Sequence, residues 1–94
     1  MAIVMLMHWP EATKEQYEEV RRDVKWETDV PAGAKFHTAW FGDDGLHVLD
    51  LWDSAEQFQR FAETRLNPAT QRAGVQGKPR VQFAEAHAIF APNV

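Results

Sequence analysis

Short apolar runs alternate along this chain with segments whose apolar residues recur at helical spacing. Residues 3–9 are apolar apart from His8 and are closed by Pro10, and the length of this run favours a β-strand over a helix. Three later segments also have the pattern of strands: residues 34–41, 46–53 and 80–90. The segment Gly42-Asp-Asp-Gly45 has the composition of a hairpin turn, which predicts that the second and third strands pair antiparallel.

The first helical segment follows Pro10 closely. Thr13 is placed as an N-cap, and Gln16 lies three residues later to complete a capping box. Tyr17, Val20 and Val24 then recur at helical spacing among charged residues. This pattern predicts a surface helix with one buried stripe, which should end near residues 26–28 before a turn.

The second helical segment is predicted to begin at Asp53 or Ser54. Its buried face would consist of Ala55, Phe58, Phe61 and Ala62. Because the residue before a proline avoids the helical region, we expect the helix to weaken at Asn67. Pro68 suits the first position of a short extra helix, which Gly74 would end.

This order of elements, β-α-β-β-α-β, is the ferredoxin-like split βαβ pattern. It predicts a single α+β domain over residues 1–94, with a four-stranded antiparallel sheet that carries both helices on one face. On the third strand, we expect Leu49 and Leu51 to point toward the helices. On the last strand, the residues expected to point the same way are the small ones: Ala84, Ala86 and Ala88.

The opposite face of the sheet would then be uncovered. By alternation, its side chains would be Val48, Asp50, Trp52, Phe83, Glu85, His87 and Ile89. This set is too aromatic to face water and too polar for an ordinary core. We therefore expect two copies to pack face to face as a homodimer that encloses a cavity.

Composition limits the possible functions. The chain has 94 residues and no cysteine, which excludes disulfides, thiolate zinc sites and cysteine nucleophiles. Ten basic and fourteen acidic residues give a net charge of −4, which argues against nucleic-acid binding. No run approaches the roughly 20 apolar residues of a membrane span, and no signal peptide is evident. We expect a cytoplasmic protein that binds neither nucleic acid nor membranes.

The segment Asp50-Leu-Trp-Asp-Ser-Ala-Glu-Gln-Phe58, together with the length and the order of elements, resembles the dimeric α+β barrel superfamily. Within it, the chain resembles the antibiotic-biosynthesis-monooxygenase-like (ABM-like) domains. The resemblance implies a homodimeric barrel with a pocket for a small molecule. It also implies chemistry of the kind found in cofactor-independent oxygenases, haem-degrading enzymes or small isomerases and cyclases.

Two departures from family patterns narrow these possibilities. The quinone-forming members have a cavity tryptophan that matches Trp52 and an asparagine four residues earlier, where this chain has Val48. The haem-degrading members have a helix tryptophan and a later histidine, where this chain has Phe61 and residues 70–71. Haem degradation is therefore not expected, and no flavin or haem signature is present. We expect no bound cofactor, so any oxygenase reaction would draw its reactivity from the substrate.

Two imidazoles and two carboxylates are the candidate catalytic groups: His37, His87, Asp50 and Glu85. A carboxylate beside a histidine can tune a general base toward neutral pH. The same four groups could ligate Zn, Fe or Mn, although no closely spaced pair of metal ligands is present. Alternatively, each histidine hydrogen-bonds within the sheet or lies at a dimer seam. Which face of residues 34–41 lines the cavity is left open by the sequence, and we place His37 there.

The candidate ligand-binding side chains are Trp52, Val48 and Phe83. The function that follows is a small-molecule enzyme similar to cofactor-independent monooxygenases, acting on an aromatic or polyketide-type substrate. One alternative is a binding or accessory protein that uses the same cavity without catalysis. Another is a metal-binding barrel protein with histidine and carboxylate ligands.

Overall fold

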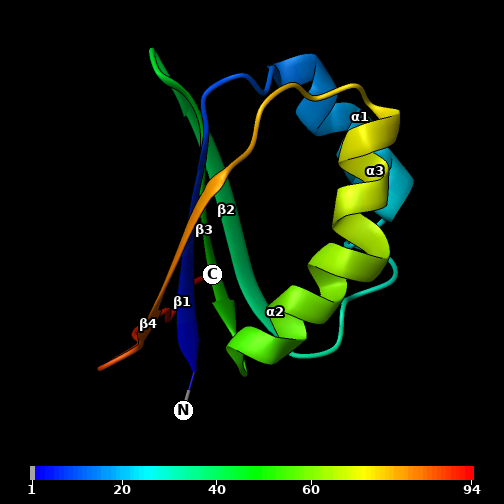
Figure 1. Ribbon diagram of the computed structural model, residues 1–94. Helices are drawn as coiled ribbons and strands as arrows, with labels where there is room; N and C mark the ends of the chain where they lie inside the picture. The colour runs from blue at the N-terminus through cyan, green and yellow to red at the C-terminus, as the bar shows by residue number, and fades with distance from the viewer. Residues whose placement is uncertain (1) are drawn as a thin grey trace.

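The computed structural model describes residues 2–94, in which four antiparallel strands form one sheet and the helices cover one of its faces (Figure 1). The strands lie in the order β2-β3-β1-β4. Their bounds are Ile3–Trp9 for β1, Ala34–Gly42 for β2, Gly45–Trp52 for β3 and Arg80–Glu85 for β4. The predicted ferredoxin-like β-α-β-β-α-β arrangement is confirmed.

Helix α1 (Lys14–Val24) begins at the predicted capping box. Thr13 Oγ1 accepts a hydrogen bond from the Gln16 N–H at 3.1 Å, and Gln16 Oε1 accepts one from the Thr13 N–H at 3.1 Å. These bonds satisfy two groups that a helix start leaves free. At the other end, Lys25 adopts a left-handed conformation with φ 59°, which ends the helix slightly before residues 26–28.

The second helical segment continues through Pro68. Helix α2 (Ala55–Phe61), the five-residue π-helical turn η1 (Ala62–Leu66) and α3 (Asn67–Arg72) follow one another directly. A proline lacks an N–H and crowds the carbonyl four residues earlier. The wider π turn, in which the Asn67 N–H donates to the Ala62 carbonyl, accommodates this. At the position where the helix was expected to weaken, the structure has a π-helical turn followed by α3.

Among residues 2–94, no helix is long and apolar enough to cross a membrane.

The helices cover the face of the sheet opposite to the predicted one. On β3, Val48, Asp50 and Trp52 are buried, whereas Leu49 and Leu51 are half-buried on the other face. On β4, the Phe83 ring packs against Phe58 of α2, and Ala84 pairs with Val4 on the uncovered side. The alternation of side chains correctly predicted which residues share a face of the sheet. The prediction of which face the helices cover was wrong. The physical reason is that the Asp50 carboxylate has hydrogen-bond donors in the core, which a sequence does not reveal.

Strand β4 is shorter than predicted. It ends at Glu85, and the Ala86 N–H donates to the Ala2 carbonyl at 2.9 Å. Because β1 begins at Ile3, residues beyond Glu85 have no neighbouring strand with which to pair. Residues 87–94 are therefore exposed and irregular, and the prediction of a strand to Phe90 is wrong at its C-terminal end.

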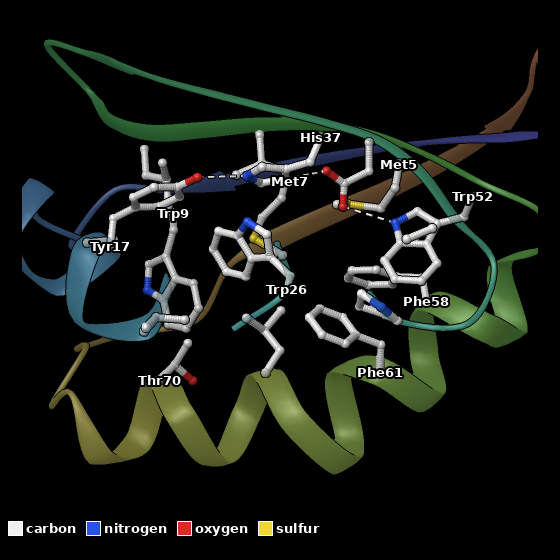
Figure 2. A pocket seen from close by; sticks show the side chains of 18 of the residues that line it. Met5, Met7, Trp9, Tyr17, Trp26, His37, Trp52, Phe58, Phe61 and Thr70 are labelled. Atoms are coloured by element: carbon white, nitrogen blue, oxygen red, sulfur yellow. Dashed lines mark hydrogen bonds and ion pairs between the residues drawn. The ribbon is translucent and has the colours of Figure 1, made fainter. Parts of the chain in front are cut away.

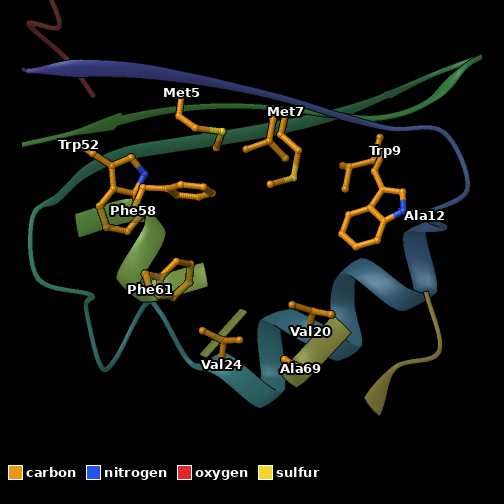
Figure 3. Close-up of a cluster of buried hydrophobic side chains, with 12 residues drawn as sticks. Met5, Met7, Trp9, Ala12, Val20, Val24, Trp52, Phe58, Phe61 and Ala69 are labelled. Atoms are coloured by element: carbon orange, nitrogen blue, oxygen red, sulfur yellow. The ribbon is translucent and has the colours of Figure 1, made fainter. Parts of the chain in front are cut away.

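The hydrophobic core lies between the sheet and the helices (Figure 3). Met5, Met7 and Trp9 of β1 face Val20 and Val24 of α1 across this layer. Met5 has no exposed surface. Further core side chains come from α2 and α3: Phe58, Phe61 and Ala69.

Met5→Ala should lower the free energy of unfolding by about 2–5 kcal/mol, because it removes most of a fully buried apolar side chain. Val30→Ala is the matched control, since Val30 is 64% exposed and its truncation should change stability by less than about 0.5 kcal/mol. Urea unfolding followed by circular dichroism measures both values. Equal effects of the two substitutions would contradict this placement of the core.

Candidate functional site

A cavity of about 250 Å³ lies between the sheet and the helices of a single chain (Figure 2). Its lining is mostly aromatic and aliphatic, with few polar groups, as is typical of small-molecule sites. The larger apolar side chains around it are Met5, Met7, Trp9, Trp26, Trp52, Phe58 and Phe61. The sequence predicted a cavity between two copies of the sheet, and the structure has this one under the helices instead.

Asp50 of β3 places a carboxylate against this cavity with only 6% of its surface exposed. The Trp52 Nε1–H donates to Asp50 Oδ2 at 3.0 Å, and the His37 Nδ1–H donates to Oδ1 at 2.7 Å. The strand register accounts for both contacts. His37 of β2 lies directly opposite Asp50, and Trp52 follows two residues later on the same face. Each carboxylate oxygen therefore has a donor, as burial of such a group requires.

Tyr17 extends this chain of hydrogen bonds onto helix α1. Its hydroxyl oxygen lies 2.7 Å from His37 Nε2. In the neutral imidazole with its Nδ1 proton directed at Asp50, the Nε2 atom acts as acceptor and the Tyr17 hydroxyl donates. The result is an Asp50–His37–Tyr17 chain, in which a carboxylate fixes the orientation and tautomer of an imidazole that bonds to a phenol (Figure 2).

Aromatic packing holds the middle of this chain in place. The His37 ring is stacked with the Tyr17 ring at a centroid distance of 6.1 Å, and the Trp26 ring lies 5.1 Å away, tilted by 54°. Burial raises the pKa of Tyr17 to about 12, while the nearby Arg21 guanidinium acts in the opposite direction. The phenol therefore keeps its proton across the physiological range and can donate or relay it.

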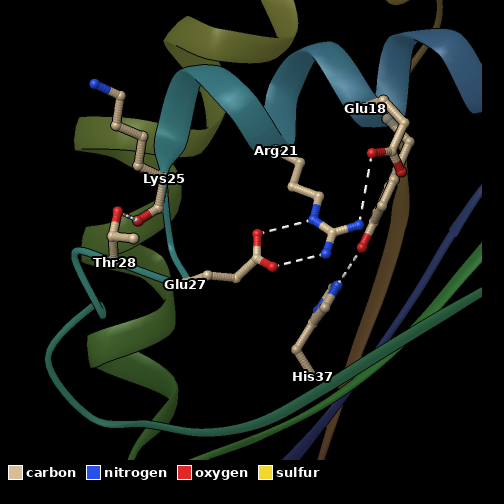
Figure 4. Close-up of polar contacts among 7 residues, drawn as sticks. Glu18, Arg21, Lys25, Glu27, Thr28 and His37 are labelled. Carbon is tan, nitrogen blue, oxygen red and sulfur yellow. Dashed lines mark hydrogen bonds and ion pairs between the residues drawn. The ribbon is translucent and has the colours of Figure 1, made fainter.

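The same histidine also borders a groove on the outside of the protein. Tyr17, Trp26 and His37 line both the cavity and this groove, and 32% of the His37 side chain is exposed. Across the groove, the Arg21 guanidinium donates to both Glu27 carboxylate oxygens at 2.8 and 2.7 Å (Figure 4). These hydrogen bonds lower the pKa of the Glu27 carboxyl. His37 therefore lies between the cavity and the solvent-filled groove.

Solved structures of known proteins share this architecture. A protein of unknown function from Nitrosomonas europaea, NE2512, matches with a TM-score of 0.66 and 15% identity, over 99% of this chain and 95% of its own. A variant of SnoaB, a cofactor-independent oxygenase from Streptomyces nogalater, matches with a TM-score of 0.63 and 14% identity, over 98% and 97%. The ActVA-Orf6 monooxygenase of Streptomyces coelicolor, solved with the ligand nanaomycin D, matches with a TM-score of 0.59 and 18% identity, over 98% and 92%.

This chain has the ABM-like α+β fold. No protein-family model and no curated protein sequence matches it. At these identities the likeness shows the fold alone, so any chemistry must be argued from the residues of this chain.

Within the ABM-like fold, the structure brings together some of the predicted site residues. His37, Asp50, Trp52 and Val48 all line the cavity. The sequence left open which face of residues 34–41 lines the cavity, and in the structure His37 lies on the face that the helices cover. The predicted ligand contact Phe83 is not among the lining residues and packs behind Phe58 instead.

The other two predicted catalytic residues lie outside the cavity. Glu85 is exposed at the end of β4, and His87 is exposed beyond it. Both lie outside because β4 ends at Glu85. The alternation of side chains along a strand, which placed His87 on the same face as Glu85, does not continue beyond that residue. The predicted cluster of two imidazoles and two carboxylates is therefore not formed within residues 2–94.

Sequence reasoning missed Tyr17 and Trp26 as residues that line the cavity. Tyr17 was assigned to the buried stripe of α1, which is correct, but its hydroxyl has a histidine partner twenty residues away in sequence. Trp26 follows the left-handed cap at Lys25, and this turn directs the chain over the cavity. One signal for Tyr17 was present in the sequence, which was its position on the apolar stripe of a helix. A buried tyrosine hydroxyl usually has a hydrogen-bond partner.

Tyr17 is the only tyrosine of the chain, so its ionisation can be followed by ultraviolet absorbance. The folded protein should show a tyrosinate midpoint near 12, against about 10 in urea. Because the pKa is raised by folding, this group contributes stability below pH 10 that is lost as the pH rises through 12. A midpoint near 10, with a native circular dichroism spectrum, would contradict the burial of the phenol.

Proposed function

We propose that this protein is a small-molecule enzyme that uses the Asp50–His37–Tyr17 chain as an acid–base group on an aromatic or polyketide-type substrate. The observation that carries the proposal is two successive 2.7 Å hydrogen bonds, from a buried carboxylate through an imidazole to a phenol, at the wall of an apolar cavity. Such a chain orients a base and stabilises the positive charge that forms when the base takes up a proton.

The shape and lining of the cavity support an aromatic substrate. Its volume of about 250 Å³ is slightly below the usual range of about 300–1,000 Å³ for ligand sites, which indicates a compact molecule. Rings from Trp26, Trp52 and Phe61 border the space and offer flat surfaces for stacking. The Tyr17 hydroxyl and the His37 ring are polar groups against which a substrate hydroxyl or carbonyl could be oriented.

In the reaction we propose, the substrate gives a proton to the Tyr17 oxygen while the Tyr17 proton passes to His37 Nε2. The resulting imidazolium is paired with Asp50, and it can release its proton through the outer groove. The substrate anion is then electron-rich enough to react with dioxygen. Overall, a methylene group becomes a carbonyl, one oxygen atom enters the product and the other leaves as water with the two methylene hydrogens. The oxygenase descriptions of SnoaB and ActVA-Orf6 support this class of reaction.

Anthrone tests the proposal, because oxidation of its single methylene group gives anthraquinone and water. We expect the protein to accelerate dioxygen consumption and anthraquinone formation above the rate in buffer. His37→Gln and Tyr17→Phe should each lower the turnover by about 100-fold or more, as loss of a general acid–base group does. Both variants should retain the native circular dichroism spectrum, since each keeps the size of the side chain.

His87→Gln is the matched control, because His87 is exposed and lies outside the cavity lining. Its turnover should equal that of the unmodified protein. Equal losses in His37→Gln and His87→Gln would contradict the assignment of the base to the cavity, and no acceleration with anthrone or related phenols would contradict the oxygenase reaction.

A binding or accessory protein is the second candidate function, and the apolar cavity favours it. Nanaomycin D, the ligand of the ActVA-Orf6 structure, is the probe, with tryptophan fluorescence as the readout. A binding protein would bind it without turning over any substrate, and Trp52→Phe would weaken binding while His37→Gln would not. Catalysis that depends on His37 excludes this alternative.

We also propose that the protein is a homodimer through the sheet face opposite the helices. Leu6 and Trp40 on this face are 41% and 48% exposed, and Leu49 and Leu51 lie between them half-buried. An apolar patch of this kind is usually an interface, and a two-fold axis lets one patch cover its own copy.

Sedimentation velocity at micromolar concentration should therefore show a dimer. Leu6→Glu should convert it to a monomer, because the substitution puts a charge into the proposed interface. Gln71→Glu, on the exposed side of α3, should remain dimeric. A monomeric unmodified protein would overturn this proposal and would leave the single-chain cavity unaffected.

A further inference from the structure

A group of side chains of the types that bind metal ions lies on the face of the sheet opposite the cavity. His8 of β1 and His47 of β3 are directly paired across the two strands, and Asp44 occupies the β2–β3 hairpin beside them. Each of the three offers one ligand atom, and these atoms lie within 4.8 Å of one another. None of the three belongs to the Asp50–His37–Tyr17 hydrogen-bond chain, and none lines the cavity proposed for the substrate.

The two imidazoles are held parallel by stacking. Their ring centroids are 4.5 Å apart with an interplanar angle of 8°, and Trp40 stacks on the other side of His47 at 5.3 Å. Both Nε2 atoms are directed at Asp44. His47 Nε2 lies 2.7 Å from Asp44 Oδ1, and His8 Nε2 lies 2.8 Å from the Asp44 carbonyl oxygen and 3.5 Å from Oδ2.

Two glycines of the hairpin give the Asp44 carboxylate its position. A Cβ at Gly42 would lie 2.9 Å from Asp44 Oδ1, so the absence of a side chain there leaves room for the carboxylate. Gly45 has φ 105°, and a Cβ on it would lie 2.5 Å from the Pro10 carbonyl oxygen. The hairpin is thus packed closely onto the end of β1, which brings Asp44 next to His8.

We propose that His8, Asp44 and His47 form a binding site for a divalent transition-metal ion, with Zn²⁺ as the best match. Two imidazole nitrogens and one carboxylate oxygen are a common donor set for zinc, and the fourth position is left for water. Ligand atoms about 2.1 Å from a tetrahedral ion are about 3.4 Å apart, so the His47–Asp44 distance would lengthen by about 0.7 Å.

The exposure of the group in the single chain leaves it open to an ion from solvent. Asp44 supplies the one carboxyl group of the set, beside the two imidazoles. Asp44 is the most exposed of the three side chains, at 61%, whereas the histidines are 31% and 25% exposed. The ion would bind to side chains already aligned by the strand pairing, and it would link β1, β3 and the hairpin.

Isothermal titration of the full chain with ZnCl₂, and a parallel titration with CoCl₂ followed by visible absorbance, test the site. We expect saturation at one ion per chain, with a tetrahedral Co²⁺ spectrum. His47→Gln and Asp44→Asn should each weaken Zn²⁺ binding by about 100-fold or more, because loss of a direct ligand should exceed the 10–100-fold loss seen on removing its supporting partners. His87→Gln, which removes an exposed histidine outside the group, should bind as the unmodified protein does.

Asp44→Asn changes an exposed side chain without changing its size, so it should fold normally. It therefore tests the site even if His47→Gln misfolds. Absence of saturable binding, or unchanged binding in Asp44→Asn and His47→Gln, would overturn the proposal. The stoichiometry of the titration is the remaining check, since saturation at one ion per two chains would show an intermolecular bridge in place of this site. The outcome is independent of the proposed oxygenase reaction, because the ligands and the cavity lie on opposite faces of the sheet.

Discussion

The burial of one carboxylate, Asp50, is the constraint around which the rest of this molecule is arranged. A carboxylate can remain in an apolar layer only if its oxygens have donors, and loss of one partner of a buried charge typically costs about 3–5 kcal/mol. Here the donors are the Nδ1–H of His37 and the Nε1–H of Trp52. Both side chains line the cavity. The hydrogen bonds that stabilise the buried carboxylate therefore also fix the orientation of His37, the proposed base.

This requirement connects the fold to the site. The register of β2 against β3 puts His37 opposite Asp50, and the capping box at Thr13 sets the start of the helix that carries Tyr17. A shift of one residue in β2 would turn His37 away from the cavity and leave Asp50 without its strongest partner. The hydrogen-bond chain therefore favours the same register that positions the proposed chemistry.

Much of the architecture could be predicted from local patterns. The capping box, the hairpin glycines and Ser54, which caps α2 through the Gln57 N–H, are local signals, and each proved correct. The face of the sheet was predicted wrongly because alternation separates Asp50 from Leu49 without saying which one is covered. Of the residues that the sequence singled out, Asp50, Trp52 and His37 line the cavity. The Tyr17 contact with His37 was not predicted, because it depends on packing between distant segments.

The most direct measurement is the tautomer of His37 by long-range ¹H–¹⁵N NMR at pH 8, with His37→Gln used to assign its signals. The Asp50–His37–Tyr17 chain predicts a single neutral tautomer with the proton on Nδ1 and Nε2 as acceptor. Asp50→Asn should weaken this preference, because an amide is uncharged and has only one oxygen for the two donors, His37 and Trp52. A His37 ring with its proton on Nε2, or one that exchanges freely between tautomers, would contradict the hydrogen-bond chain and the chemistry proposed for it.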